Sequence, residues 1–402
     1  MRILFLSPQP LYQDRGSSIA NKLIIEVLSE RGEETDVITY AEGKTVEYPH
    51  ITLLRTPDYN FLRGIRPGFS AKKIVCDIFM FFKAVRLLVR GERYDVVHAV
   101  EESAFIALLF KWFLRIPYIY DMDSSLAQQM VEKYPSLKFA STALNFFEGV
   151  AIRNATAVIV VCDALGDIAK EHNPKKLITL RDVPLLDDDP VEITEDLRSD
   201  LGIDGPILMY VGNLESYQGI DLLVESTAKA TQETVTPFHV VVVGGADADI
   251  EKYRAMSVDK GISDRIHFIG PRPIGDLKMY LSQADILLSP RTKGNNTPMK
   301  IYSYLYSGKP IVATDLWTHT QVLTTDVSVL ADPDTNAYAG GMVKLVEDAA
   351  LRDRLGGAGK QLIEDHYSYE VFHETLTGLL DWLNSEFDSS SKGVIATSAG
   401  SS

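Results

Sequence analysis

The sequence predicts an α/β protein of two doubly wound, Rossmann-like domains that face each other across a cleft. Short apolar runs rich in β-branched residues alternate with amphipathic helical stretches along the 402 residues, a pattern typical of a parallel sheet wrapped by helices. The chain is also longer than one hydrophobic core usually serves. Near its middle, the Pro- and Asp-rich stretch RDVPLLDDDPVEITEDL interrupts the alternation and indicates an exposed connection.

The expected strands divide evenly between the two halves of the chain. Those of the first half are Ile3–Ser7, Thr35–Tyr40, Ile51–Arg55, Val96–Ala99, Tyr118–Asp121 and Ala157–Val161. Those of the second half are Ile207–Gly212, His239–Val243, Ile266–Ile269, Ile286–Ser289, Pro310–Ala313 and Val327–Leu330.

The connection places the domain boundary near Asp189. We therefore expect an N-terminal Rossmann-like domain over residues 1–190 and a C-terminal Rossmann-like domain over residues 191–365. Residues 366–385 are expected to form a helix that returns to the N-terminal domain. Residues 386–402 end in SSSKGVIATSAGSS, which has little apolar surface to bury, and they are expected to be disordered.

Charge and composition exclude several classes of protein. The net charge is −15, with −2 in residues 1–190 and −13 in residues 191–402, which argues against nucleic-acid binding. Cys76 and Cys162 are too few for a disulfide framework or a metal site. MRILFLSP is interpreted as a first strand and not as a signal peptide, and no apolar run reaches the roughly 18 residues that span a bilayer. We expect a cytoplasmic protein or one peripheral to the inner face of a membrane.

Loops that follow the strands are the expected ligand sites, because open parallel sheets bind ligands beyond the carboxyl ends of their strands. After the first strand, Gly16 permits a tight turn into a helix that starts at about Ser17, where backbone N–H groups suit a phosphate. Asn213 and Gln218 lie in the loop after Ile207–Gly212, and Gly244 ends the strand His239–Val243. Each of these three loops is equally explained as a structural turn.

The loop after Ile286–Ser289 is the richest in polar residues. A helix is expected to start near Pro298 with Thr297 as its N-cap. Arg291, Lys293 and Lys300 surround this expected helix start. Cations at a helix N-terminus suit a diphosphate, although a solvated basic loop is the alternative.

Two features of the first half are also candidates for function. The segment DMDSS places Asp121 and Asp123 at the end of a strand, where helix capping is the alternative to a metal site; His98, after another strand, is more often structural than catalytic. Residues 61–115 carry ten Lys and Arg against five Asp and Glu, interleaved with aromatic residues. This composition fits contact with anionic lipid headgroups as well as it fits core packing with a solvated face.

Four segments carry a family resemblance when they are taken in order. They are RILFLSPQPLYQDRGSSIANKLIIEVLSERGEETDVIT, ILMYVGNLESYQGIDLLVES, HVVVVGG followed by RIHFIGP, and PMKIYSYLYSGKPIVATD. Over about residues 1–380 the chain resembles family 4 of the retaining glycosyltransferases, which have the GT-B fold. The resemblance implies transfer of a sugar from a UDP- or GDP-linked donor, with no other cofactor and no metal, to a lipid-linked, glycan or small-molecule acceptor. A glycosylated acceptor of this kind suggests polysaccharide or glycolipid biosynthesis. The resemblance also implies that residues 1–190 form the acceptor domain and residues 191–365 the donor domain.

The departures from that family lie where its chemistry is normally found. An arginine and a lysine that grip the diphosphate in many members are matched by Asn213 and Gln218. The Glu-x7-Glu pair, whose second member holds the ribose, is matched by Asn295 and Ser303. A histidine near the transferred sugar is matched by Asp123.

Two explanations of these departures remain open. Arg291, Lys293 and Lys300 replace the missing cations and Ser303 bonds the ribose, which gives a divergent active enzyme; this is the interpretation that we favour. Asp123 would then orient the sugar or accept a hydroxyl proton. Alternatively, the chain is a catalytically silent homologue that binds a nucleotide sugar or a partner. A Rossmann oxidoreductase is disfavoured because no G-x-G-x-x-G follows the first strand, whereas a nucleotide-sugar epimerase remains a further enzyme class.

Overall fold

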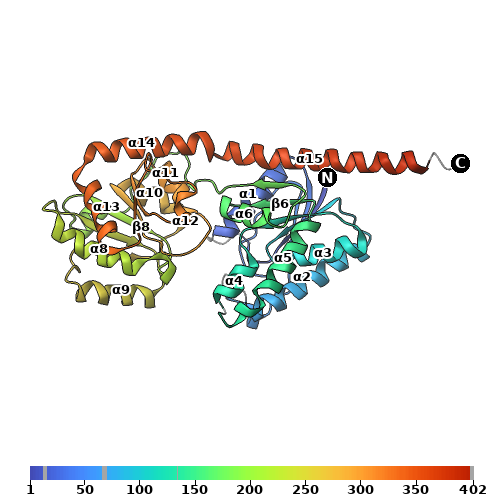
Figure 1. Cartoon of the computed structure of the whole chain (residues 1–402), viewed down its shortest axis with the longest axis horizontal. Coiled ribbons are helices and arrows are strands. Elements are labelled where there is room, and N and C mark those ends of the chain that lie inside the picture. The colour runs from blue at the N-terminus through green and yellow to red at the C-terminus, as the bar shows by residue number, and fades with distance from the viewer. Residues whose placement is uncertain (12–15, 66–69, 134, 399–402) are drawn as a thin grey trace. The chain divides into compact units, whose positions relative to one another are not determined.

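The computed structural model describes residues 1–11, 16–65, 70–133 and 135–398. The chain divides into two compact units: unit 1 comprises Met1–Arg181 with Phe372–Ser402, and unit 2 comprises Asp182–Val371. Each unit contains one parallel sheet wrapped by helices (Figure 1). The prediction of two doubly wound α/β domains is therefore confirmed.

Unit 1 contains a seven-stranded sheet in the order β3-β2-β1-β4-β5-β6-β7. Its central strands are buried along their whole length, as in parallel sheets covered on both faces. The strands are β1 (Arg2–Ser7), β2 (Glu34–Thr39), β3 (Ile51–Arg55), β4 (Val96–Val100), β5 (Tyr118–Met122), β6 (Ala157–Val160) and β7 (Leu177–Thr179). The helices are α1 (Gly16–Glu30), α2 (Ala71–Val89), α3 (Ser103–Leu114), α4 (Leu126–Lys133), α5 (Ser141–Asn154), α6 (Asp163–Lys170) and α15 (Tyr369–Ser398).

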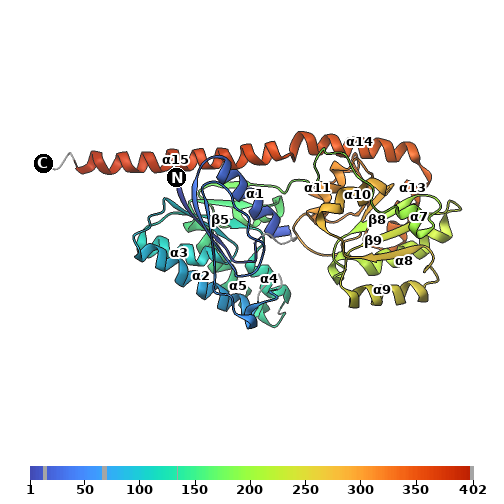
Figure 2. The same ribbon diagram turned by 180° about the vertical axis from the view of Figure 1, so that it is seen from behind.

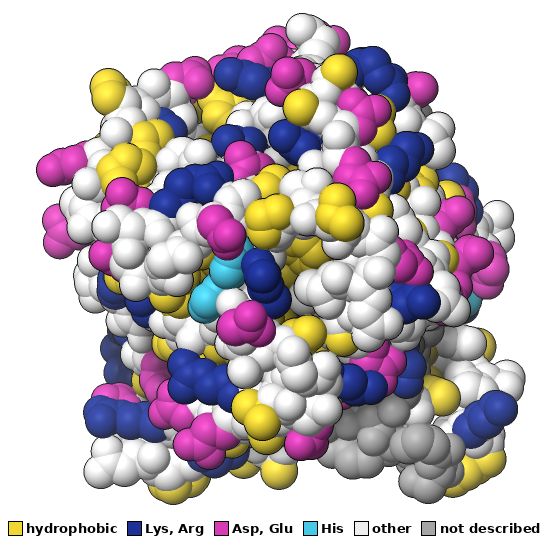
Figure 3. Space-filling view, turned by 90° about the vertical axis from the view of Figure 1, so that its left-hand side faces the viewer, with side chains coloured by type: hydrophobic (Ala, Val, Ile, Leu, Met, Phe, Trp, Pro, Cys, Tyr) yellow, Lys and Arg dark blue, Asp and Glu magenta, His cyan; other side chains and the backbone are white. Residues whose placement is uncertain are grey.

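Unit 2 contains a six-stranded parallel sheet in the order β10-β9-β8-β11-β12-β13 (Figure 2). The strands are β8 (Ile207–Val211), β9 (His239–Val243), β10 (Ile266–Gly270), β11 (Ile286–Ser289), β12 (Ile311–Thr314) and β13 (Val329–Ala331). The helices are α7 (Leu197–Leu201), α8 (Ile220–Glu233), α9 (Asp247–Asp259), α10 (Leu277–Gln283), α11 (Lys300–Tyr306), α12 (Trp317–Thr320), α13 (Thr335–Glu347) and α14 (Ala349–His366). Figure 3 shows one face of this unit, on which acidic and basic side chains are interspersed.

All twelve expected strands are present, with shifts of one or two residues at their ends. Strand β7 was not predicted from the sequence. It has only three residues, and all of them are partly exposed. So short a run gives no alternation of apolar and polar positions to recognise.

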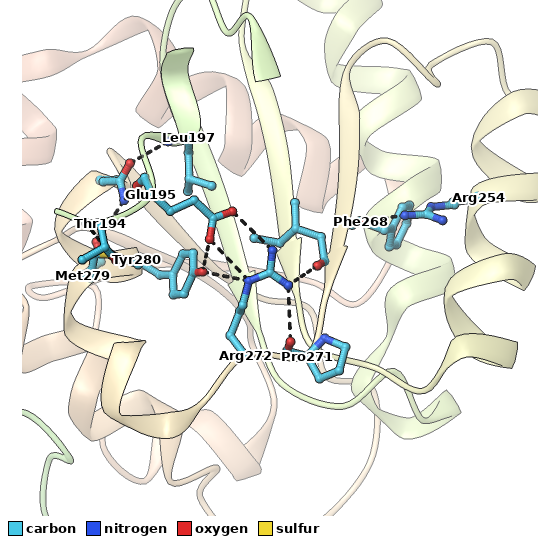
Figure 4. Close-up of polar contacts among 11 residues, drawn as sticks. Thr194, Glu195, Leu197, Arg254, Phe268, Pro271, Arg272, Met279 and Tyr280 are labelled. Carbon is cyan, nitrogen blue, oxygen red and sulfur yellow. Dashed lines mark hydrogen bonds and ion pairs between the residues drawn. The ribbon is translucent and has the colours of Figure 1, made fainter. Parts of the chain in front are cut away.

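The boundary between the units lies at Arg181 and Asp182, earlier than the expected position near Asp189. The acidic connection is tied to unit 2, where Lys278 forms an ion pair with Asp187 at 2.7 Å. Glu195 pairs with Arg272 at 3.3 Å and accepts a hydrogen bond from Tyr280 (Figure 4). These ion pairs and hydrogen bonds therefore attach the connection to unit 2, although its composition indicated only an exposed linker.

The C-terminal helix is longer than expected. The structure continues α15 to Ser398, beyond residue 385 where the expected helix ends, while residues 399–402 lie outside the described residues. Within unit 1, Asp381 pairs with Arg31 at 2.7 Å and Glu386 pairs with Lys175 at 2.6 Å. Once these contacts hold the helix, each added residue costs little, because helix propagation is easier than nucleation.

Candidate functional site

The sheet of unit 2 has a switch point between β8 and β11. These strands are neighbours, while β9 and β10 extend the sheet on one side and β12 and β13 extend it on the other. The loops that leave their carboxyl ends therefore diverge and form the crevice where doubly wound sheets bind ligands. The Thr292 N–H donates to the carbonyl of Tyr217 at 2.9 Å, which joins the two loops.

Lys300 is the central cation of this crevice. Its Nζ lies 3.9 Å from the centre of the Tyr210 ring and 3.5 Å from Gln218 Oε1. A Cβ atom added at Gly212 would meet this Nζ at 2.9 Å, so the ammonium lies against the backbone that follows β8.

No carboxylate among the described residues forms an ion pair with Lys300. Although part of this residue is exposed, burial of its ammonium lowers the pKa of Lys300 well below its usual range, and nearby Arg291 lowers it further. A desolvated cation without a carboxylate is costly unless an anion reaches it. The surroundings of Lys300 therefore fit an anionic ligand.

Arg291 belongs to the same loop and is held in a defined conformation. Its Nε donates to the Lys293 carbonyl at 2.7 Å and its Nη1 donates to the Asn296 carbonyl at 3.2 Å. Its guanidinium lies 5.2 Å from the centre of the Tyr217 ring. The turn requires Gly294, whose φ is +115° and whose added Cβ would meet Arg291 Nη2 at 2.2 Å. The structure thus brings together two of the three predicted cations, whereas the Lys293 side chain is exposed.

Side chains from the end of β12 and the segment that follows it hold the Arg291 loop in place. Thr314 Oγ1 donates to the Arg291 carbonyl at 2.5 Å, Thr318 Oγ1 to the Asn296 carbonyl at 2.6 Å, and Gln321 Nε2 to the Asn295 carbonyl at 2.7 Å. Sequence reasoning missed these supports. The polar run WTHTQ after an apolar strand was the signal that could have revealed them.

His319 joins these side chains to the end of β11. Its Nε2 lies 2.8 Å from Ser289 Oγ, and its Nδ1 lies 2.9 Å from the Thr314 carbonyl. A neutral ring that donates from Nδ1 and accepts at Nε2 satisfies both contacts. Burial lowers the pKa of His319 to about 3.

We expect this histidine to make stability depend on pH. Because its folded pKa lies below its unfolded value of about 6.5, the unfolded chain takes up a proton first as the pH falls. The stabilisation is full above pH 6.5 and is lost toward pH 3, by about 2 kcal/mol at pH 5. Urea unfolding at pH 7 and pH 5 should show this loss in the wild type and not in His319→Gln. Parallel pH profiles would contradict it.

The other residues predicted in unit 2 have varied surroundings. Asn213 is exposed, and its Oδ1 accepts a hydrogen bond from the Glu215 N–H. Gln218 is buried beneath Lys300. Thr297 is only 7 % exposed, and its Oγ1 has no hydrogen-bond partner among the described residues, which leaves a buried hydroxyl for a ligand.

Two residues predicted to contact the donor also have structural roles. Ser303 is 1 % exposed, and its Oγ accepts a hydrogen bond from the Leu185 N–H at 3.0 Å. Gly244 has a φ of +114°, and a Cβ at this position would meet the Gly212 carbonyl oxygen at 2.2 Å. Packing of two loops therefore accounts for this glycine.

The expected helix near Pro298 is present and begins two residues later, because α11 starts at Lys300. Its N-cap is Met299 and no side chain caps it, so the prediction of Thr297 as the N-cap is wrong. With only seven residues, it has a weak dipole, because few peptide units add to the field. The cationic side chains remain the main attraction for an anion.

Unit 1 positions the remaining predicted residues. Helix α1 begins at Gly16, and the loop residues 12–15 before it lie outside the described residues. Asp123 lies in the loop between β5 and α4 and is half-buried. Asp121 contacts His98 Nε2 at 2.9 Å, and both side chains are buried.

The described residues contain neither a cluster of metal-ligating side chains nor a helix that could span a membrane. Within residues 1–11, 16–65, 70–133 and 135–398, no three His, Cys, Asp or Glu side chains gather in a way that could hold a metal ion. In those same ranges, no helix is long and apolar enough to cross a bilayer.

Comparison with known proteins gives consistent matches. Residues 205–348 match the family described as "Glycosyl transferases group 1", and residues 16–180 match "Glycosyltransferase Family 4". The D-inositol 3-phosphate glycosyltransferase of Corynebacterium diphtheriae is 25 % identical, with 89 % of each chain covered. The phosphatidyl-myo-inositol mannosyltransferase of Mycobacterium leprae is 23 % identical, with 92 % of this chain and 94 % of that protein covered. HepE from Anabaena, crystallised with UDP-glucose, superposes with a TM-score of 0.72 at 16 % identity over 95 % of this chain and 99 % of that chain.

Proposed function

Since the chain belongs to glycosyltransferase family 4 and is a nucleotide-sugar-dependent glycosyltransferase, we propose that it transfers a sugar from a UDP- or GDP-linked donor with retention of configuration. The donor diphosphate contacts Lys300 and Arg291 in unit 2. No other cofactor takes part. The observation that carries this proposal is the position of the Lys300 ammonium, which lies against the Tyr210 ring and Gln218 with no carboxylate partner among the described residues.

The proposed chemistry relies on stabilising the charge of the departing nucleoside diphosphate. Lys300 and Arg291 are already in place, so little reorganisation accompanies the transition state. The buried Thr297 hydroxyl adds a donor to a phosphate oxygen. The Ser303 hydroxyl keeps its proton free to donate to the ribose while its oxygen accepts from Leu185. Gly16 of unit 1 offers backbone N–H groups at the start of α1.

On the acceptor side, we assign Asp123 to orient the transferred sugar or to accept the hydroxyl proton of the acceptor. The acceptor hydroxyl replaces the nucleoside diphosphate on the same face of the sugar. Among the relatives, the Mycobacterium leprae protein is named for a lipid acceptor. We propose a lipid-linked acceptor for this chain, and hence a place in glycolipid or polysaccharide biosynthesis.

A lipid-linked acceptor requires access to a membrane, and unit 1 has a suitable surface. Helices α2, α3 and α5 lie side by side (Figures 1 and 2), with the rings of Phe81 and Phe110 stacked 6.0 Å apart. We call their outer surface the apolar face. Its exposed side chains are Ile74, Val75, Ile78, Phe82, Val89, Leu109, Trp112, Phe113, Leu114, Phe146 and Phe147. Such a large exposed apolar patch typically marks an interaction site.

Basic side chains on the same helices fit an anionic lipid surface. Arg86 and Arg90 are exposed at the end of α2 and Arg115 at the end of α3. Lys73 does not take part, because it is buried against Glu102 at 2.5 Å. We propose that the apolar face binds the cytoplasmic leaflet of a membrane, with the enzyme otherwise in the cytoplasm.

This membrane proposal predicts a result in vesicle sedimentation. Replacing both Trp112 and Phe113 with Ser should weaken binding to phosphatidylglycerol vesicles at least tenfold, because two exposed aromatic rings no longer enter the lipid. Trp317→Ser removes an exposed aromatic residue from unit 2 and should leave sedimentation unchanged. Equal sedimentation of the two variants would refute the proposal.

Donor binding is tested by calorimetric titration of UDP, GDP and their sugar conjugates into the wild type and Lys300→Met. We expect one nucleotide to bind the wild type and the variant to lose most of that affinity. The anomeric configuration of the product, read by NMR, tests retention. A product of inverted configuration would contradict the proposed stereochemistry without affecting the donor site.

A further inference from the structure

A pocket of about 200 Å³ lies in unit 1 among helices α2, α3, α4 and α5. Helix α3 follows β4 and helix α4 follows β5, so the pocket lies at the carboxyl edge of the sheet, where open parallel sheets bind ligands. Most of its lining is apolar and comes from Phe105, Leu126, Ala127, Met130, Leu144 and Phe147.

One end of the pocket is polar and leads toward Asp123. Lys73 Nζ lies 2.5 Å from Glu102 Oε1 and 3.6 Å from Glu101 Oε2. The Ser124 hydroxyl donates to Glu101 Oε1 at 3.1 Å, and Ser124 directly follows Asp123. Lys73 and Glu102 therefore connect the pocket, through Glu101, to the loop that carries the proposed catalytic carboxylate.

Glu148 also lines the pocket, but its carboxylate is already engaged. It accepts hydrogen bonds from the Leu126 N–H at 2.7 Å and from the Ser125 hydroxyl at 2.8 Å, which caps the start of α4. Burial raises the pKa of both carboxyl groups, but hydrogen bonds oppose this rise at Glu148. At Glu102 the neighbouring carboxylate of Glu101 raises the pKa further, to about 8. A hydroxyl group of a ligand is therefore a better hydrogen-bond partner for Glu102 than an anionic group.

The other end of the pocket reaches the apolar face. Phe147 lines the pocket and is 58 % exposed. The centre of its ring lies 5.7 Å from the centre of the Phe146 ring. A chain that leaves a membrane held at this face could thus enter the pocket without crossing a polar surface. A purely glycan acceptor would bury hydroxyl groups against walls that offer few hydrogen-bond partners.

We propose that this pocket binds a hydrocarbon segment of the acceptor and directs its hydroxyl-bearing end to the Lys73–Glu102 pair beside the Asp123 loop. This inference rests on the proposed function, and it specifies the acceptor as an amphiphile. The volume suits about six to eight carbon atoms, since apolar cavities of roughly 150 Å³ accept a benzene-sized ligand.

Alkyl β-D-glucosides of increasing chain length, titrated below their micelle concentration into the full chain, test this proposal. Affinity should rise about fourfold with each added methylene and then level off when the pocket is full. Leu144→Trp fills the pocket from its rim and should weaken octyl glucoside binding at least tenfold. Asn145→Trp adds the same ring at an exposed position of the same helix and should bind as the wild type does.

Other measurements separate this site from the donor site. Ala127→Leu fills the pocket from α4, so it replaces Leu144→Trp if that variant unfolds. Nucleotide titration of both variants should match the wild type, and a failure of nucleotide binding in the wild type would count against the donor proposal alone. Octyl glucoside affinity that both filling variants leave unchanged, or an absence of binding by the wild type, would overturn the pocket assignment.

Discussion

Replacing Lys300 with Met is expected to lower the affinity for the donor nucleotide tenfold to a hundredfold without destabilising the protein. A hydrogen bond to a charged group contributes about 1.5–3 kcal/mol, which corresponds to that loss. Because the Lys300 ammonium is desolvated without a carboxylate partner among the described residues, its removal should raise the free energy of unfolding by up to about 2 kcal/mol. The ratio kcat/KM should fall about a hundredfold or more, since the same cation stabilises the leaving group.

Lys309→Met is the matched control for this experiment. Lys309 is also half-buried in unit 2, and its Nζ donates to the Ser282 carbonyl at 3.1 Å, but it precedes β12 and so lies at the opposite edge of the sheet. Donor affinity should be unchanged in this variant. If Lys300→Met keeps the wild-type donor affinity, Lys300 does not contact the donor. If the variant unfolds, Lys300 has a structural role.

Substituting Gly244 with Ala should destabilise unit 2 by about 3 kcal/mol or more. The backbone at φ +114° is strained for an L-residue, and the added Cβ would meet the Gly212 carbonyl oxygen at 2.2 Å. In a unit of this size the midpoint of thermal unfolding should fall by about 6–12 °C. Calorimetry of the ligand-free protein measures this fall directly.

Two other glycines of unit 2 distinguish backbone strain from the steric clash of the added Cβ as causes of the destabilisation. Gly261 has a φ of +71° with nothing near its missing Cβ, so Ala there should cost only about 1–2 kcal/mol of backbone strain. Gly275 has neither constraint, and its substitution should be nearly neutral. If Gly244→Ala unfolds at the same temperature as Gly275→Ala, the close packing of the two loops is not what requires a glycine.

The fold was predictable because short apolar strands alternate with amphipathic helices many times along the sequence. Runs such as Ile286–Ser289 and His239–Val243 are mostly apolar and are buried along their whole length, as is typical of strands covered on both faces. The boundary was less predictable, because Glu195 and Asp187 are acidic residues of a linker in sequence and partners of Arg272 and Lys278 in the structure. Those partners lie far along the chain, and composition does not reveal such pairing.

The site was predictable in its residue types and less so in its geometry. Arg291 and Lys300 were recognised as cations near the end of one strand, but their role depends on Tyr210 of β8 and on Gly212 and Tyr217 of the loop that follows it. Ser303 occupies a position expected to contact the donor, yet its oxygen accepts the Leu185 N–H of the linker. Only the packed structure shows which side chains already have partners.

The most direct test of the donor site compares a nucleoside diphosphate with its nucleoside. Calorimetric titration of UDP and uridine, and of GDP and guanosine, measures how much affinity the diphosphate contributes. We predict that one diphosphate binds the wild type at least tenfold more tightly than its nucleoside and that Lys300→Met removes most of this difference. Equal affinity of diphosphate and nucleoside in the wild type, or a difference that survives in Lys300→Met, would contradict the assignment of the diphosphate to Lys300.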